Sequence, residues 1–233
     1  MREIIFDTET TGLDPRSGHR LVEIGCVELV DRRESGRTFH AYFHPERDMP
    51  AEAEAVHGLS VQFLSDKPLF ASRVDELLEF LGDAPMVAHN AAFDFGFINA
   101  ELARVGRPAL DMARMCCTVQ MARKLHPGAK HSLDALCTRY GIDRSHRIKH
   151  GALLDAELLA HLYIEMTGGR QIGLGLAAAS AVTAAPGVAS PPRPAAPARP
   201  FREPRPHAAT PAELARHAEF VAALTQPLWH DSP

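Results

Sequence analysis

The sequence predicts an α/β protein: a mixed sheet flanked by helices, then a disordered linker and a short C-terminal helix. Three observations support this prediction. Apolar residues near the N-terminus suit buried strands, later segments follow the helical period, and the chain from residue 177 changes to alanine and proline. Strands followed by helices around one further short strand are typical of a mixed sheet covered by helices.

Most of the predicted strands lie in the first fifty residues. Residues 4–6 are expected to form a buried strand, with residues 21–30 and 38–43 as its antiparallel neighbours, and residues 86–88 form a short later strand. Helical patterns cover residues 71–82, 93–106, 117–125, 132–140 and 152–167. Together these elements make a folded domain of residues 1–168.

The rest of the chain divides into three segments. Residues 169–176 are a short peptide beside the folded domain, and residues 177–209 are a linker; nine of the eighteen prolines lie within residues 177–211. Such a stretch has too little apolar bulk to fold and is expected to be extended and flexible. Residues 210–233 contain a helical pattern again.

Composition limits the classes of protein that this chain fits. With 233 residues, 45% of them hydrophobic, there is material for one sizeable core and an appendage. A charge directly after residues 4–6 argues against a signal peptide, and the alanine and serine of residues 174–185 argue against a membrane span. Four cysteines without C-x-x-C spacing fit reduced thiols in a cytosol.

The charge of the chain is unevenly distributed. A net charge of −4 argues against a protein that coats nucleic acid by electrostatics alone. From Arg123 to Lys149, however, there are seven basic residues and two acidic ones. Such a run is usually a solvated surface, but here it leads directly to His150.

Asp7 and Glu9 stand at the end of the first predicted strand. Side chains alternate along a strand, so both carboxylates point to the same face. Carboxylates placed in this way repel each other and lose hydration, and a divalent cation between them would relieve both costs. Taken alone, the pair also fits an ordinary polar strand end.

Two further aspartates begin apolar helix faces. Asp94 precedes apolar residues at helical spacing, and Asp155 does the same on a separate helix. One aspartate in a first turn can simply complement the helix dipole. Four acids of this kind in one domain indicate a shared cation, and carboxylate oxygens suit magnesium or manganese better than zinc.

His150 lies five residues before Asp155, in the basic segment. A lone histidine is usually a surface residue, and this chain has thirteen histidines. Histidine changes charge near neutral pH, and His150 stands beside a candidate metal ligand. It is therefore the candidate base that takes a proton from water.

These residues lie within three longer strings: FDTETTG at 6–12, HNAAFDFGF at 89–97 and HGALLDAELL at 150–159. The strings resemble the motifs of the DEDDh exonucleases, the DnaQ-like family, and among them those of the epsilon-type proofreading subunits of bacterial DNA polymerase III. The resemblance covers residues 2–168, including VHGLS at 56–60 and HSLDALCTRYGID at 131–143. It implies a ribonuclease H-like fold and removal of nucleotides from single-stranded or frayed DNA 3′ ends.

The resemblance also implies roles for particular residues in and beside these strings. Asp7, Glu9, Asp94 and Asp155 would bind two divalent ions, Mg²⁺ or Mn²⁺, with Asp7 bridging both. His150 would be the general base. The terminal nucleotide would be held by Thr8, Glu9, Thr10, Leu13, His57, His89, Asn90 and Phe93.

Three functions remain open from the sequence. The chain is the proofreading subunit of a replicative polymerase in a bacterial cytosol, a stand-alone DEDDh exonuclease in DNA repair or RNA trimming, or a catalytically silent scaffold. The complete set of four acids and His150 argues against the scaffold. The linker and terminal helix argue against the stand-alone enzyme, which needs neither.

Two segments beyond the folded domain are candidates for protein contacts. Gln171, Leu174 and Leu176 resemble the peptides with which bacterial replication proteins bind the sliding clamp. Further on, Thr210 is a candidate cap of a helix that would be marginal by itself and that either folds back on the domain or docks on a partner. By resemblance, that partner is the catalytic (alpha) subunit of polymerase III, contacted through Leu214, Phe220, Val221, Leu224 and Trp229.

Overall fold

A computed structural model of the chain describes residues 1–145, 147, 149–169 and 208–224. The chain divides into two units, Met1–Ala179 and Ser180–Pro233, and each is described by itself.

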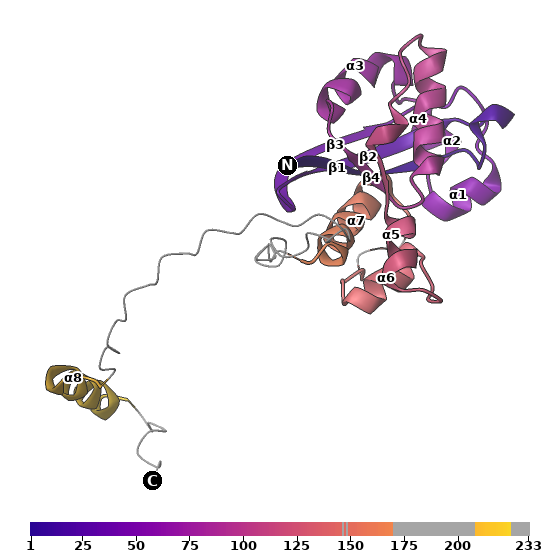
Figure 1. Cartoon of the computed structure of the whole chain (residues 1–233). Coiled ribbons are helices and arrows are strands. Elements are labelled where there is room, and N and C mark those ends of the chain that lie inside the picture. Colours follow the sequence, from indigo (N-terminus) through magenta and orange to yellow (C-terminus); the bar gives the residue numbers. More distant parts are fainter. Residues whose placement is uncertain (146, 148, 170–207, 225–233) are drawn as a thin grey trace, which may run out of the picture. The chain divides into compact units, whose positions relative to one another are not determined.

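The first unit is built on a five-stranded mixed sheet (Figure 1). The strands lie in the spatial order β3-β2-β1-β4-β5. Along the chain they are β1 (Arg2–Thr10), β2 (Leu21–Val30), β3 (Arg33–Tyr42), β4 (Met86–Ala88) and β5 (Met115–Cys117). The first three pair antiparallel, whereas β4 pairs parallel with both β1 and β5. β1 is therefore the central strand.

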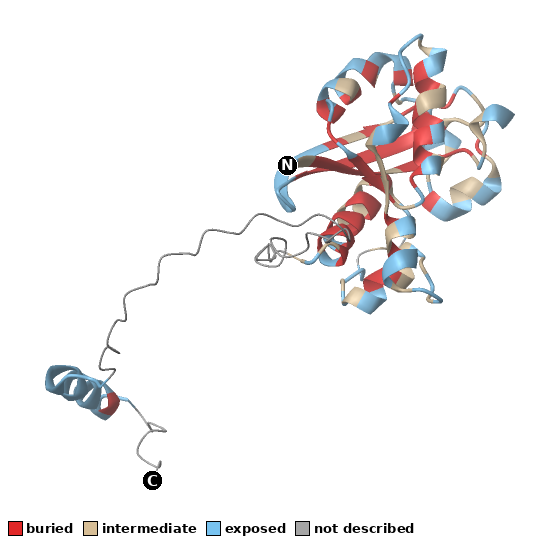
Figure 2. Cartoon of the chain, viewed as in Figure 1, coloured by how far each residue is buried: buried red, intermediate tan, exposed pale blue. Residues whose placement is uncertain are grey.

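Helices cover both faces of the sheet (Figure 1). They are α1 (Ala51–His57), α2 (Val61–Leu64), α3 (Phe70–Leu81), α4 (Ala92–Arg104), α5 (Thr118–Leu125), α6 (Leu133–Tyr140) and α7 (Ala152–Met166), with 3₁₀ turns at Pro15–Ser17 and Met112–Arg114. One core joins Ile4 and Phe6 of β1 to α3 and α4, and the other joins Ile5 to α5, α6 and α7. Figure 2 shows the buried residues concentrated along the strands and on the helix sides that face them.

The alternation along β1 divides its side chains between these two cores. Ile4 and Phe6 face the α3–α4 side, and Ile5 faces the α7 side. The same alternation continues to the end of the strand and assigns Asp7 and Glu9 to the α7 side and Thr8 to the α4 side. A strand buried on both faces thus presents polar groups to two helices at its carboxyl end.

The predicted mixed sheet flanked by helices is confirmed, and the predicted elements match the structure within a few residues. Some details differ. Strand β5 was not predicted; it extends the sheet beside β4 and ends at Cys117, so α5 starts at Thr118, one residue later than expected. β3 begins at Arg33 rather than at residue 38, and the short helices α1 and α2 were not predicted.

The second unit contains helix α8 (Pro211–Ala222), which confirms the predicted C-terminal helix. The Thr210 side chain accepts the backbone N–H of Glu213, whose carboxylate accepts the backbone N–H of Thr210, so both ends of a capping box are present. Leu214 and Phe220 are exposed and Val221 is buried. Trp229 and the peptide residues Gln171, Leu174 and Leu176 lie outside the described residues.

Within the described part of the chain, no helix has the length and apolar character that crossing a membrane requires.

Candidate active site

The end of β1 supplies two of the predicted ligands. Asp7 lies opposite Gly25 of β2, and Glu9 lies opposite Glu23. Asp7 is half-buried and Glu9 is buried. Their common face is the one covered by α7, as the alternation along the strand predicts.

Helix α4 supplies Asp94. β4 ends at Ala88, and the chain turns through Asn90, whose φ of 70° is in the left-handed region that asparagine tolerates better than most residues. α4 then begins at Ala92, and Asp94 in its first turn is only 2% exposed. The Thr8 hydroxyl donates to Asp94 Oδ1 over 2.7 Å, which fixes the carboxylate against β1.

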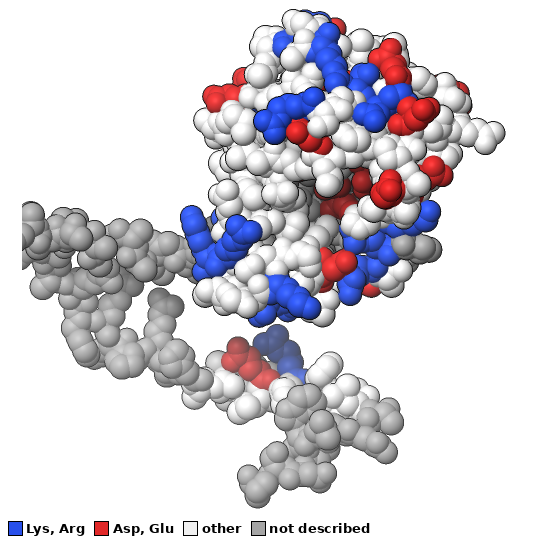
Figure 3. Space-filling model, turned by 90° about the vertical axis from the view of Figure 1, so that its right-hand side faces the viewer, with Lys and Arg blue, Asp and Glu red and all other residues white. Residues whose placement is uncertain are grey.

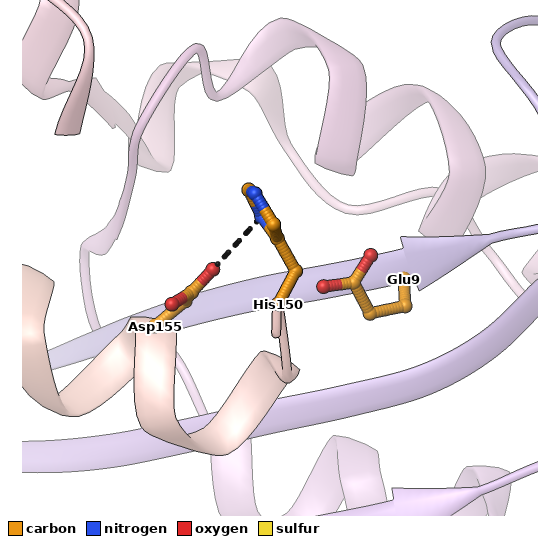
Figure 4. A group of neighbouring side chains, drawn as sticks. All are labelled: Glu9, His150 and Asp155. Carbon is orange, nitrogen blue, oxygen red and sulfur yellow. Dashed lines mark ion pairs between the residues drawn. The ribbon is translucent and has the colours of Figure 1, made fainter. Parts of the chain in front are cut away.

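Helix α7 supplies Asp155 and places His150 beside it. Asp155 is in the first turn and is 3% exposed, whereas His150, just before the helix, is exposed. His150 Nδ1 lies 3.3 Å from Asp155 Oδ2. Figure 4 shows these two side chains on one side and Glu9 on the neighbouring strand, all directed toward a common space.

The donor atoms of this group fit a metal ion. One ligand atom from each of Glu9, His150 and Asp155 lies within 4.8 Å of the other two. Asp7 and Asp94 line the same cavity, so carboxylates from three elements converge there. Hard divalent cations such as Mg²⁺ and Mn²⁺ bind oxygen donors of this kind.

The electrostatics of the site also favour a bound cation. Burial, and then repulsion from Asp94 and Glu9, raises the pKa of Asp7 well above its usual range. Burial and the nearby Glu23 raise the pKa of Glu9 to about 8. Burial raises the pKa of Asp94 to about 7, although the hydrogen bond from Thr8 acts in the opposite direction. Negative charge is therefore costly here without a positive partner.

Arg147 is the residue at this site that the sequence did not single out. Its Nε and Nη2 donate to the two carboxylate oxygens of Asp155 over 2.5 and 2.7 Å, and its Nη1 donates to Asp134 over 2.9 Å. Its Nη2 also lies 2.8 Å from His150 Nδ1. The basic segment was the signal that could have indicated it, but a charge run does not distinguish an inward-facing arginine from a solvated one.

The site consists of two cavities that share Thr8, Glu9 and Phe93. The small cavity, about 270 Å³, contains all four acids and His150, together with His89 and Arg147. The large cavity is about 610 Å³. A space-filling view shows acidic atoms within a hollow on this face of the protein and basic side chains on the surface next to it (Figure 3).

Most of the predicted substrate residues surround the large cavity, namely Thr8, Glu9, Thr10, Leu13, His57 and Phe93. Leu13 is 85% exposed, so it offers an apolar side chain at the rim. His57 is buried, and its Nδ1 accepts the backbone N–H of Leu59, so the neutral ring carries its proton on Nε2. His89 lines the small cavity, and Asn90 lines neither cavity.

The chain is similar to known exonucleases and polymerase subunits. Residues 4–163 match the family described as Exonuclease (RNase_T). The DNA polymerase III subunit epsilon of Rickettsia conorii is 52% identical over 185 residues, which cover 78% of this chain and 80% of the relative. The protein of the same name from Escherichia coli K12 is 47% identical over 176 residues, 72% of either chain.

Solved structures of exonucleases also resemble this chain. A structure of exonuclease X in complex with 5′ overhanging duplex DNA is 27% identical, with a TM-score of 0.54 over 71% of this chain and 90% of that one. The nuclease domain of 3′hExo, a DEDDh family member bound to rAMP, has a TM-score of 0.62 over 71% of this chain and 91% of that one. At 17% identity, it shows the shared fold alone.

The chain belongs to the exonuclease family and, within it, to the DNA polymerase III epsilon subunits. It is accordingly a proofreading 3′→5′ exonuclease, as the DEDDh resemblance implied.

Proposed function

We propose that this chain hydrolyses the terminal phosphodiester at mispaired DNA 3′ ends, using two divalent ions held by Asp7, Glu9, Asp94 and Asp155. The observation that carries the proposal is the convergence of these acids, from β1, α4 and α7, on one small cavity beside His150. Mg²⁺ and Mn²⁺ are the ions that the oxygen donors suit. Bound there, the ions would stabilise charge on the attacking and leaving oxygens.

We propose His150 as the general base. It is exposed at the edge of the small cavity, so water reaches it. Its Nδ1 lies 2.8 Å from Arg147 Nη2 and 3.3 Å from Asp155 Oδ2. A neutral imidazole would take a proton from the attacking water and release it to solvent. The exposed position makes that release direct, because no further protein group has to carry the proton away.

The large cavity is proposed to receive the terminal nucleotide. Leu13 and Phe93 offer apolar surface for stacking or packing against a base, and Thr8 and Thr10 line the same cavity. Stacking does not depend on base identity, and a proofreading enzyme has to remove any of the four bases. The preference for mispaired ends would then come from fraying, since an unpaired terminus reaches the cavity more easily.

Two contacts with other proteins are proposed for the segments after the nuclease domain. Helix α8 would dock its apolar residues on the catalytic subunit of the polymerase in the bacterial cytoplasm, a proposal supported by the names of the relatives and by the exposure of Leu214 and Phe220. The peptide containing Gln171, Leu174 and Leu176 would bind the sliding clamp.

The role in proofreading is tested by comparing matched primers. Release of the 3′ nucleotide from a mispaired end should exceed release from a paired end, and the catalytic subunit should raise the rate on DNA. A stand-alone trimming enzyme would degrade single-stranded RNA and DNA at similar rates with no response to the subunit. A chain without activity on any 3′ end would be a scaffold.

The clamp contact is tested with the double variant Gln171→Ala, Leu174→Ala. Surface plasmon resonance should detect weak binding of the wild-type chain to purified clamp and no binding of the variant. Exonuclease activity on free oligonucleotides should be the same for both chains. Undiminished clamp binding by the double variant would contradict the assignment.

A further inference from the structure

We infer that Gly25 is a positioning residue: it lets the first turn of α7 lie directly on the sheet, which brings Asp155 and His150 to the acids of β1. The inference rests on the proposed roles of those residues. Gly25 lies on β2 directly opposite Asp7. It shares the face of the sheet that α7 covers.

The close approach is between backbones. A Cβ atom added to Gly25 would lie 2.3 Å from both N and Cα of Leu153 and 2.4 Å from the carbonyl carbon of Ala152. These are the first two residues of α7. The three nearest atoms are all main chain, so no side-chain rotation could relieve these contacts, and only a movement of the helix start or of β2 would.

The need for glycine here is steric and not conformational. The φ angle of Gly25 is not positive, so an alanine could adopt its backbone conformation. Gly25 is also paired on both sides, with Asp7 of β1 and His40 of β3, so the strand has little freedom to move away. The start of α7 is therefore the part that would move.

Such a movement would reach the site directly. Ordinary contacts of a Cβ begin at 3.4 Å, so relief of a 2.3 Å contact needs a shift of about 1 Å. Metal–ligand distances tolerate only about 0.2 Å. Asp155 is two residues after Leu153, and His150 is two residues before Ala152. Both would move relative to Asp7 and Glu9, which stay on β1.

The test compares Gly25→Ala with Gly96→Ala in the full-length chain. Gly96 is an exposed residue of α4 at which a Cβ would meet nothing within 4 Å, so it is a matched control. Thermal unfolding by circular dichroism, in EDTA and over a Mn²⁺ titration, reports metal binding through the rise in Tm. Steady-state kinetics on a single-stranded oligonucleotide separate kcat from KM.

Gly96→Ala should keep the wild-type Mn²⁺ response, kcat and KM. Gly25→Ala should unfold cooperatively but need on the order of tenfold more Mn²⁺ for the same rise in Tm, with kcat lowered at least tenfold and KM little changed.

An unchanged Mn²⁺ response and kcat in Gly25→Ala would overturn the inference. So would the loss of cooperative unfolding in EDTA, because Gly25 would then be required for the fold and not for the placement of α7. If the wild-type chain itself gave no rise in Tm with Mn²⁺, the proposed metal site would fail, and the inference would fail with it.

Discussion

Asp94 illustrates how a single side chain at this site depends on two elements. Its backbone belongs to the first turn of α4, and its carboxylate accepts the hydroxyl of Thr8 from β1. The helical spacing predicted that Asp94 faces the core. The spacing could not identify Thr8 as its partner, because periodicity gives the face of an element and not the neighbour across it.

The orientations of Arg147 and His150 also could not be predicted from the sequence. Both belong to a basic segment that, from composition, fits a solvated surface. In the structure, Arg147 turns inward and binds both oxygens of Asp155, while His150 remains exposed beside it. An orientation of this kind depends on where α6 and α7 meet, and local sequence does not contain that information.

Replacing His150 tests its role as the base. Only neutral imidazole accepts a proton, so activity that depends on His150 as the base should be lost where the ring is protonated. His150→Ala should lose this dependence together with roughly 10²–10⁴-fold in kcat. The measurement is the pH–rate profile at saturating Mg²⁺, with His126→Ala, outside both cavities, as a control. An unchanged profile in His150→Ala would assign the proton transfer to another group.

At the scale of elements, long periodic segments were predicted well and short ones were not. α7 is buried on nearly all sides, and its bounds agree with the prediction to within one residue. β5 has three residues, Met-Cys-Cys, which are too few to establish an alternating pattern. Its conformation is set by parallel pairing with β4, a contact between segments about thirty residues apart.

Deletion of residues 210–233 tests helix α8. The truncated chain should retain the wild-type kcat and KM on free oligonucleotides, because all the acids of the site lie before residue 168. It should no longer co-purify with the polymerase catalytic subunit, because the proposed contact residues Leu214 and Phe220 are removed. Analytical gel filtration of the mixed subunits gives the result directly. Full-affinity binding by the truncated chain would place the contact elsewhere.

At the scale of the whole molecule, the site depends on segments that are far apart in the sequence. Asp7, Asp94 and Asp155 come from the beginning, middle and end of the nuclease domain. The sequence singled out four acids that line one cavity in the structure: Asp7 and Glu9 because strand alternation puts them on one face, and Asp94 and Asp155 because each begins an apolar helix face. The two-cavity arrangement, with Asn90 outside both cavities, required the tertiary structure.

The pH dependence of stability is a property of the whole fold. In the folded protein, burial raises the pKa of Glu9 to about 8 and that of Asp94 to about 7, against ordinary values near 4. The folded state therefore holds protons that the unfolded state releases. These protons stabilise the folded state at low pH, and this contribution to the free energy of unfolding is lost as the pH rises from about 4 to 8.

In EDTA, we expect the contribution of these groups to lower the Tm of the wild-type chain as pH increases over this range. Asp94→Asn should make this decrease in Tm smaller, because asparagine carries no charge. Saturating Mg²⁺ in place of EDTA should also make the decrease in Tm of the wild-type chain smaller. Calorimetry at several pH values measures both effects. Identical pH profiles for Asp94→Asn and the wild type in EDTA would contradict the assignment of the raised pKa.

The central claim is that carboxylates from three elements bind the ions that hydrolyse the 3′ terminus. Asp7 tests it most directly, because it lies on the central strand among the other acids. The measurement is single-turnover release of the 3′ nucleotide from a mispaired primer, by the wild type and by Asp7→Ala, over a Mg²⁺ titration. We predict a Mg²⁺-dependent rate for the wild type and a rate near the enzyme-free background for Asp7→Ala at every Mg²⁺ concentration, with the variant still folded. A folded Asp7→Ala chain with wild-type turnover at saturating Mg²⁺ would contradict the claim.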